Sequence, residues 1–72
     1  MLAKGRAMVE KSLRYFGISR EELARVLRMS VRTLQRRLAD PTTWTVGEMN
    51  RLGGVFGWTR EDFADFVESC SR

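Results

Sequence analysis

A chain of 72 residues predicts one globular domain, because two domains of that length would have too little apolar surface for separate cores. One cysteine and no histidine exclude an internal disulfide and offer no set of zinc ligands, so neither a metal nor a cofactor is expected. Charges interrupt the N-terminal segment throughout, which predicts a cytoplasmic protein with no membrane partner. The formal net charge is +4, but residues 1–37 carry +7 and residues 38–72 carry −3, which favours a polyanionic partner for the first part.

The first helix is expected over residues 2–16, because apolar residues recur near one face at helical spacing while basic residues lie off it. Gly17 is predicted to end this helix, since glycine readily adopts the left-handed conformation of a helix C-terminus. The apolar residues near that face are Leu2, Val9, Leu13 and Phe16.

A second helix is predicted from about residue 20 to residue 27. Its inward residues are Leu23, Ala24 and Leu27. Ser30 is the predicted N-cap of the next helix. Because only Arg28 and Met29 lie before it, the connection is expected to be a tight turn.

The third helix is expected over residues 31–38, with Leu34 and Leu38 on its inner side. It ends before Pro41, because proline disfavours helical geometry at the preceding Asp40. The polar segment that Pro41 begins is expected to be a loop.

Two more helices are predicted, over about residues 46–56 and 60–69. Their apolar residues at helical spacing are Met49, Leu52 and Phe56 in the first and Phe63, Phe66, Val67 and Cys70 in the second. Gly53 and Gly54 predict a short or frayed fourth helix, unless close packing requires them. Five helices without a strand signal indicate an all-α compact bundle.

Four of these helices are preceded by the same local pattern: an apolar residue, then Ser or Thr, and a second apolar residue four positions after the hydroxyl. The hydroxyl can accept hydrogen bonds from the first turn, and the two apolar residues can pack together. Glu22 and Glu48 can complete capping boxes. The predicted caps are Ser19, Ser30, Thr45 and Thr59, and the pattern makes Trp44 and Trp58 packing residues of the core.

The second and third helices together are typical of a helix-turn-helix, in which the second helix of the pair enters the DNA major groove. Five arginines and no acid occur between Arg25 and Arg37. The third helix is therefore predicted to have a basic outer face, with its two leucines on the inner side.

The segment from Ser19 to Trp58 resembles the Cro/CI-type helix-turn-helix family of phage and bacterial repressors, also called lambda repressor-like or XRE. It shares the S-x-E-E-L-A core over residues 19–24, the Ser30 cap and the apolar Leu34, and the likeness continues to the Trp44-Thr45 entry of the fourth helix. The resemblance implies a lambda repressor-like fold and a transcriptional regulator of double-stranded DNA, nucleoid-associated in a bacterial or phage-infected cell. It implies no enzymatic activity and no small-molecule ligand.

By this resemblance, the base-contacting residues are Val31, Arg32, Gln35 and Arg36, and the phosphate-contacting residues are Arg20, Thr42, Thr43 and Thr45. Thr33 and Arg37 are further candidates for phosphate contacts. Arg32 and Arg36 lie four apart on one helix face and suit bidentate contacts to guanine. Arg37 stands at a position that is often apolar in the family, which leaves open whether Arg36 or Arg37 reads a base. Arg28 stands where the family often has glycine, and a left-handed backbone there would cost about 1 kcal/mol or more.

Family members often pair through the C-terminal region, which implies a homodimer on a two-fold related operator. Phe66 and Val67 are the possible dimer interface, with Phe66 expected to be the more exposed, although packing on the first helix is expected to use most of their apolar stripe. Two alternatives remain at this point: a protein-interaction module of antitoxin-like or assembly type, and an architectural protein that coats DNA without sequence preference. An enzyme is a remote third, because the acidic residues of the fifth helix lack a nucleophile or histidine beside them.

Overall fold

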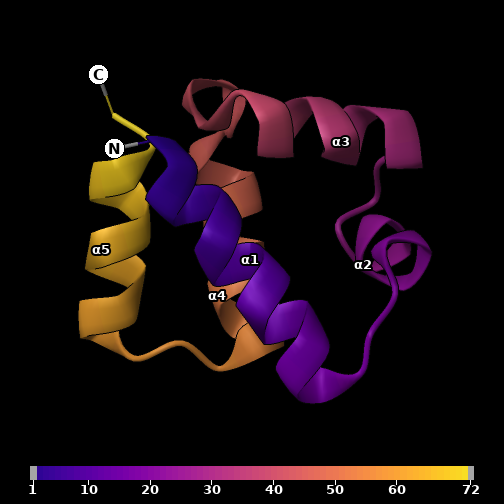
Figure 1. Cartoon of the computed structure of the whole chain (residues 1–72), viewed down its shortest axis with the longest axis horizontal. Helices are drawn as coiled ribbons and strands as arrows, with labels where there is room; N and C mark the ends of the chain where they lie inside the picture. Colours follow the sequence, from indigo (N-terminus) through magenta and orange to yellow (C-terminus); the bar gives the residue numbers. More distant parts are fainter. Residues whose placement is uncertain (1, 72) are drawn as a thin grey trace.

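The computed structural model describes residues 2–71, which fold into five α-helices and one short 3-10 helix (Figure 1). The elements are α1 (Leu2–Phe16), α2 (Arg20–Val26), α3 (Val31–Ala39), η1 (Pro41–Thr43), α4 (Val46–Phe56) and α5 (Arg60–Ser69). No strand occurs in this part of the chain. The all-α prediction is confirmed, and each helix begins and ends within one residue of its expected position. Within residues 2–71, no helix combines the length and the apolar character needed to cross a lipid bilayer.

All four predicted N-caps form, because each hydroxyl accepts a hydrogen bond from the backbone N–H three residues later. Glu22 and Glu48 reach back to the N–H groups of Ser19 and Thr45, as expected for capping boxes. Asp62 forms a third box at the start of α5. These bonds satisfy donors that have no partner inside their helices, which explains why the helix starts were readable from local sequence.

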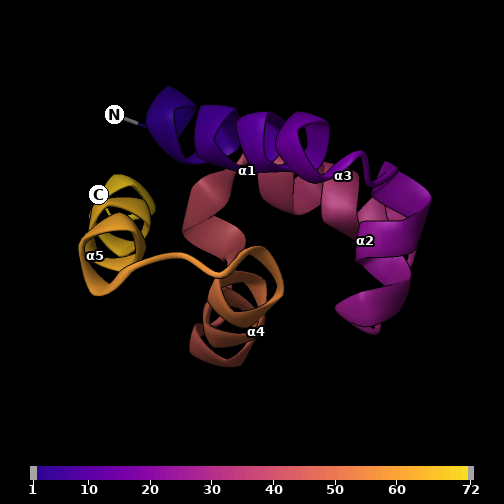
Figure 2. The same ribbon diagram turned by 90° about the horizontal axis from the view of Figure 1, so that it is seen from below.

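The helices enclose one hydrophobic core to which each of them contributes. α1 runs across the front of the molecule in Figure 1, with α5 beside it and α4 behind it, and the view from below in Figure 2 separates these layers. α3 lies across the opposite end from the α4–α5 loop, and α2 lies beside the beginning of α3. The buried apolar residues are Val9, Leu13, Leu23, Ala24, Leu27, Leu34, Leu38, Trp44, Leu52, Phe56, Phe66 and Cys70.

The assignment of Phe66 to a dimer interface is wrong, because its side chain is 0% exposed. Gly5 lets α1 approach α5 closely, because a Cβ at that glycine would lie only 2.5 Å from Ser69 Oγ, and 3.5 Å from Phe66 Cε1. The ring also contacts two tryptophans, with centroids 5.9 Å from Trp44 and 4.9 Å from Trp58. Phe66 is therefore a central core residue, and Val67 beside it is half-buried.

α4 continues without interruption through its two adjacent glycines. A Cβ at Gly53 would lie 3.1 Å from Phe63 Cδ1, so the absence of a side chain lets α5 pack closely there. The expected shortening of the helix does not occur. Nothing lies within 4 Å of a Cβ at Gly54, and no contact explains that glycine.

Candidate nucleic-acid interface

The connection from α2 to α3 is a tight turn over Leu27 to Ser30. The Met29 backbone N–H donates to the Ala24 carbonyl at 2.9 Å, and Arg28 has a φ of 59°. The left-handed conformation anticipated at Arg28 is thus confirmed, at a cost of about 1 kcal/mol or more for a residue with a Cβ. The turn directs α3 steeply away from α2, since Figure 1 looks almost along α2 while α3 lies across the view.

α3 is anchored to the core along one side only. Leu34 and Leu38 are buried beneath it, whereas Arg32, Gln35 and Arg36 are exposed on its outer side. Within residues 2–71, the guanidinium groups of Arg32 and Arg36 form no hydrogen bond or ion pair with another side chain. Both are therefore free to bind an acceptor on another molecule.

Val31 lies at the edge of this outer side. Its side chain is half-buried and packs against the core at the beginning of α3. Of the four residues predicted to contact bases, three are fully on the outer side, and Val31 presents only part of its surface.

Arg37 faces α4 instead of the outer side. Its Nε and Nη2 donate to the two Glu48 carboxylate oxygens at 2.9 and 3.3 Å, and its side chain is 20% exposed. Burial disfavours the charge of Glu48, but the hydrogen bonds from Arg37 and from the Thr45 backbone together hold the Glu48 pKa below its usual value of 4.5. This ion pair answers the question of rotation: Arg36 is outward and Arg37 joins α3 to α4.

The predicted phosphate-contacting hydroxyls are engaged in local hydrogen bonds. Thr42 Oγ1 donates to Asp40 Oδ1 at 2.6 Å, and Thr43 Oγ1 donates to the Asp40 carbonyl at 2.7 Å. Thr33 Oγ1 accepts from the Ser30 hydroxyl at 3.1 Å, and Thr45 Oγ1 accepts from the Glu48 N–H at 3.1 Å. Accepting hydroxyls keep their own proton to donate, so Thr33 and Thr45 remain donors and Thr42 and Thr43 do not.

Arg20 is also held by an intramolecular contact. Its Nη2 lies 2.9 Å from Glu10 Oε2, which joins the beginning of α2 to α1. Arg20 and Arg37, both predicted phosphate contacts, thus have carboxylate partners within the chain.

No DNA contact was predicted for two arginines that the structure exposes. They are Arg25 in the last turn of α2 and Arg28 in the turn before α3. Both lie at the end of α2 from which α3 departs, so they extend the basic surface at the beginning of α3. The signal for them was the run from Arg25 to Arg37, which contains no acid.

Among the residues that the structure describes, no three His, Cys, Asp or Glu side chains come together in a way that could hold a metal ion. The chain matches no protein-family model, and it has no significant match among curated proteins or among solved structures. The resemblance to the Cro/CI-type family therefore stays a prediction that depends on the residues of the α2–α3 segment.

Proposed function

We propose that this chain is a sequence-specific DNA-binding protein of the helix-turn-helix type, with α3 as the helix that enters the major groove. The observation that carries this proposal is the free, outward pair Arg32 and Arg36 on a helix held from beneath by Leu34 and Leu38. An arginine face without acid neighbours has no stabilising role in the core and suits a polyanion.

The dimensions and the chemistry of α3 support this assignment. The major groove of B-DNA is about 12 Å wide and admits one α-helix. Arg32 and Arg36 are one helical turn apart, so they can reach successive bases along the groove and bind guanine O6 and N7 in bidentate fashion. Gln35 between them suits adenine, and the exposed part of Val31 suits the thymine methyl group.

Phosphate contacts in the proposed complex come from groups that border α3. Arg25 and Arg28 lie at its beginning, and Thr33 and Thr45 retain hydroxyl protons. Such contacts set the register of the helix on the duplex without reading sequence. We leave Arg20, Arg37, Thr42 and Thr43 out of this set, because each uses donors within the chain.

The biological role that follows is transcriptional regulation by occupancy of a site. One copy carries one α3 and reads one short site of a few base pairs. Bound there, the protein represses by excluding other proteins from the same DNA, and no catalytic step is part of the proposal.

Selection of bound duplexes from a random pool tests this function. We expect enrichment of a short motif with guanines at a fixed spacing, since the two arginines are held on one face. The double variant Arg32→Ala, Arg36→Ala is expected to lose that enrichment. A pool that shows no preferred sequence after repeated selection contradicts the proposal and favours an architectural protein.

The alternative of a protein-interaction module has one observation in its favour. Tyr15 and Phe16 are 83% and 48% exposed, and large aromatic side chains on a surface are typical of protein interfaces. DNA binding that weakens steeply with salt supports the first function, whereas a module that binds only proteins shows no such dependence.

A further inference from the structure

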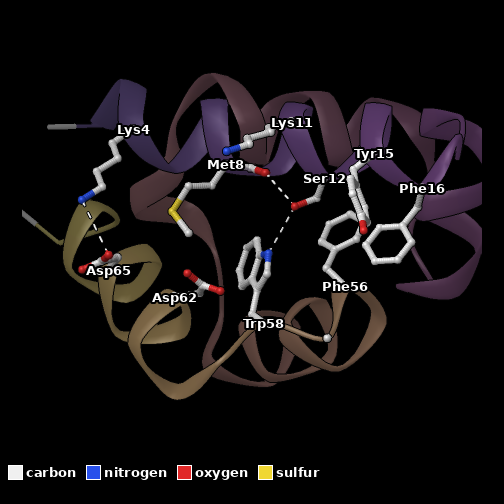
Figure 3. Close-up of a pocket in the computed structure, with 11 residues that line it drawn as sticks. Lys4, Met8, Lys11, Ser12, Tyr15, Phe16, Phe56, Trp58, Asp62 and Asp65 are labelled. Carbon is white, nitrogen blue, oxygen red and sulfur yellow. Dashed lines mark hydrogen bonds and ion pairs between the residues drawn. The ribbon is translucent and has the colours of Figure 1, made fainter.

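Outside α3, the surface has a hollow of about 390 Å³ between α1 and the α4–α5 loop. Figure 3 shows its two walls: α1 above, and the loop with the first turns of α5 below. Trp58 stands between the walls and donates from its indole N–H to Ser12 Oγ at 3.2 Å. This bond joins the α4–α5 loop to α1 across the hollow.

Aromatic rings continue from the core to the rim of this hollow. Adjacent centroids along the series are 4.9 to 6.0 Å apart. The series is Trp44, Phe66, Trp58, Phe56, Phe16 and Tyr15. It ends at Tyr15, which is 83% exposed and contacts the neighbouring Phe16 ring edge-on. A large aromatic ring exposed in this way suits burial against another protein surface.

The two walls carry opposite charges. α1 contributes Lys4 and Lys11, and α5 contributes Asp62 and Asp65. Lys4 and Asp65 face each other across one end at 3.9 Å, while Lys11 forms no ion pair within the described residues. A surface with one basic and one acidic wall is complementary to a copy of itself, which is what a two-fold symmetric interface requires.

We propose that a second copy of this chain docks on this surface, with the two-fold axis parallel to the hollow. Such an axis places the basic wall of each copy over the acidic wall of the other, so Lys11 meets the partner's Asp62. Tyr15 of each copy then enters the hollow of the other beside Gly57, where nothing lies within 4 Å of a Cβ position.

The position of this surface decides what the dimer can do. Figures 1 and 2 place the α4–α5 loop and the end of α1 on the face opposite α3. The two α3 helices of the dimer therefore point away from each other and cannot enter one duplex one helical turn apart. This step rests on the proposed function: when each α3 binds DNA, the dimer joins two duplexes.

The test begins without DNA, by sedimentation of the wild-type chain over a wide concentration range. We expect a reversible dimer whose share of the protein rises with concentration. Lys11→Glu and Asp62→Lys are each expected to weaken dimerisation at least about tenfold, since each places like charges together twice. An equimolar mixture of the two variants is expected to restore it, because both contacts then join opposite charges.

Tyr15→Ala tests the ring separately, with Val46→Ala as the matched control, since Val46 is an apolar side chain 71% exposed away from the hollow. Circular dichroism and thermal unfolding of each variant show that it is folded. We expect loss of the dimer only for Tyr15→Ala. A monomer at every wild-type concentration, or a charge-swapped mixture that stays monomeric, overturns the proposal and leaves the surface to a different protein or to none.

A bridging assay with two labelled duplexes separates this inference from the proposed function. We expect the wild type to join the duplexes and Tyr15→Ala to bind each without joining them. A dimer that forms in solution and binds no duplex contradicts the proposed function but supports the proposed dimer. A protein that binds DNA and stays monomeric supports the proposed function and contradicts the dimer.

Discussion

At the scale of single residues, Arg28 has a backbone conformation that is unfavourable for a residue with a Cβ. Its φ of 59° lies in the left-handed region, which the turn needs in order to redirect the chain from α2 into α3. A Cβ in that region meets the following carbonyl oxygen, whereas glycine has no such contact. An arginine kept there contributes positive charge beside α3 at the expense of stability.

Replacing Arg28 by glycine is therefore expected to raise the free energy of unfolding by about 1 kcal/mol. Urea titration followed by circular dichroism measures the change. The matched control is Arg25→Gly, which removes the same charge from the regular helix α2 and is expected to lower stability by about 1 kcal/mol. Two changes of the same sign would mean that Arg28 is not strained.

Single residues also show which side-chain positions could be predicted from the sequence and which could not. The spacing of apolar residues correctly placed Leu34 and Leu38 inside, because helical periodicity identifies a face. It did not predict that Phe66 is covered completely, since that depends on Gly5, a residue 61 positions away whose missing side chain brings α1 close. It also left the direction of Arg37 open, because its carboxylate partner belongs to another helix.

At the scale of elements, the boundaries of the helices were predictable and the links between them were not. Caps are local: a hydroxyl and a backbone N–H three residues later form the bond wherever the helix lies. The Arg37–Glu48 pair is different, since it joins α3 to the beginning of α4, and Glu48 also completes the capping box at Thr45. The buried Leu34 and Leu38 set the rotation of α3, and this pair joins α3 to α4 in that rotation, with Arg36 outward.

The pair makes stability depend on pH in a defined direction. The pKa of Glu48 is lowered in the folded chain from its usual 4.5, so its contribution is present above that pH and is lost as the pH falls through the lower folded value. A double-mutant cycle with Arg37→Gln and Glu48→Gln is expected to give a coupling free energy of about 1 kcal/mol at neutral pH. Thermal or urea unfolding of the four proteins measures it.

The same cycle repeated in acid is the control, because protonated Glu48 can no longer form the ion pair. The coupling is expected to approach zero there. A coupling that keeps its size in acid, or that is absent at neutral pH, contradicts the role given to this pair.

At the scale of the whole molecule, two surfaces with different character lie on opposite faces. The outer side of α3 carries positive charge, and the surface around Tyr15 carries aromatic area with charges of both signs. The uneven charge of the sequence predicted the first, since the acid-free run includes α3. The second was not predictable, because Phe16 and Phe56 lie 40 positions apart and meet only through the packing of α1 and α4.

The central claim is that the outer side of α3 binds DNA, and the affinity of matched arginine variants for a selected duplex tests it most directly. Arg32→Ala with Arg36→Ala and Arg51→Ala with Arg60→Ala each remove two exposed charges, so the non-specific attraction falls alike in both. We predict that the α3 variant loses at least about tenfold more affinity than the other, because only its arginines bind bases. Equal losses in the two variants would contradict the claim.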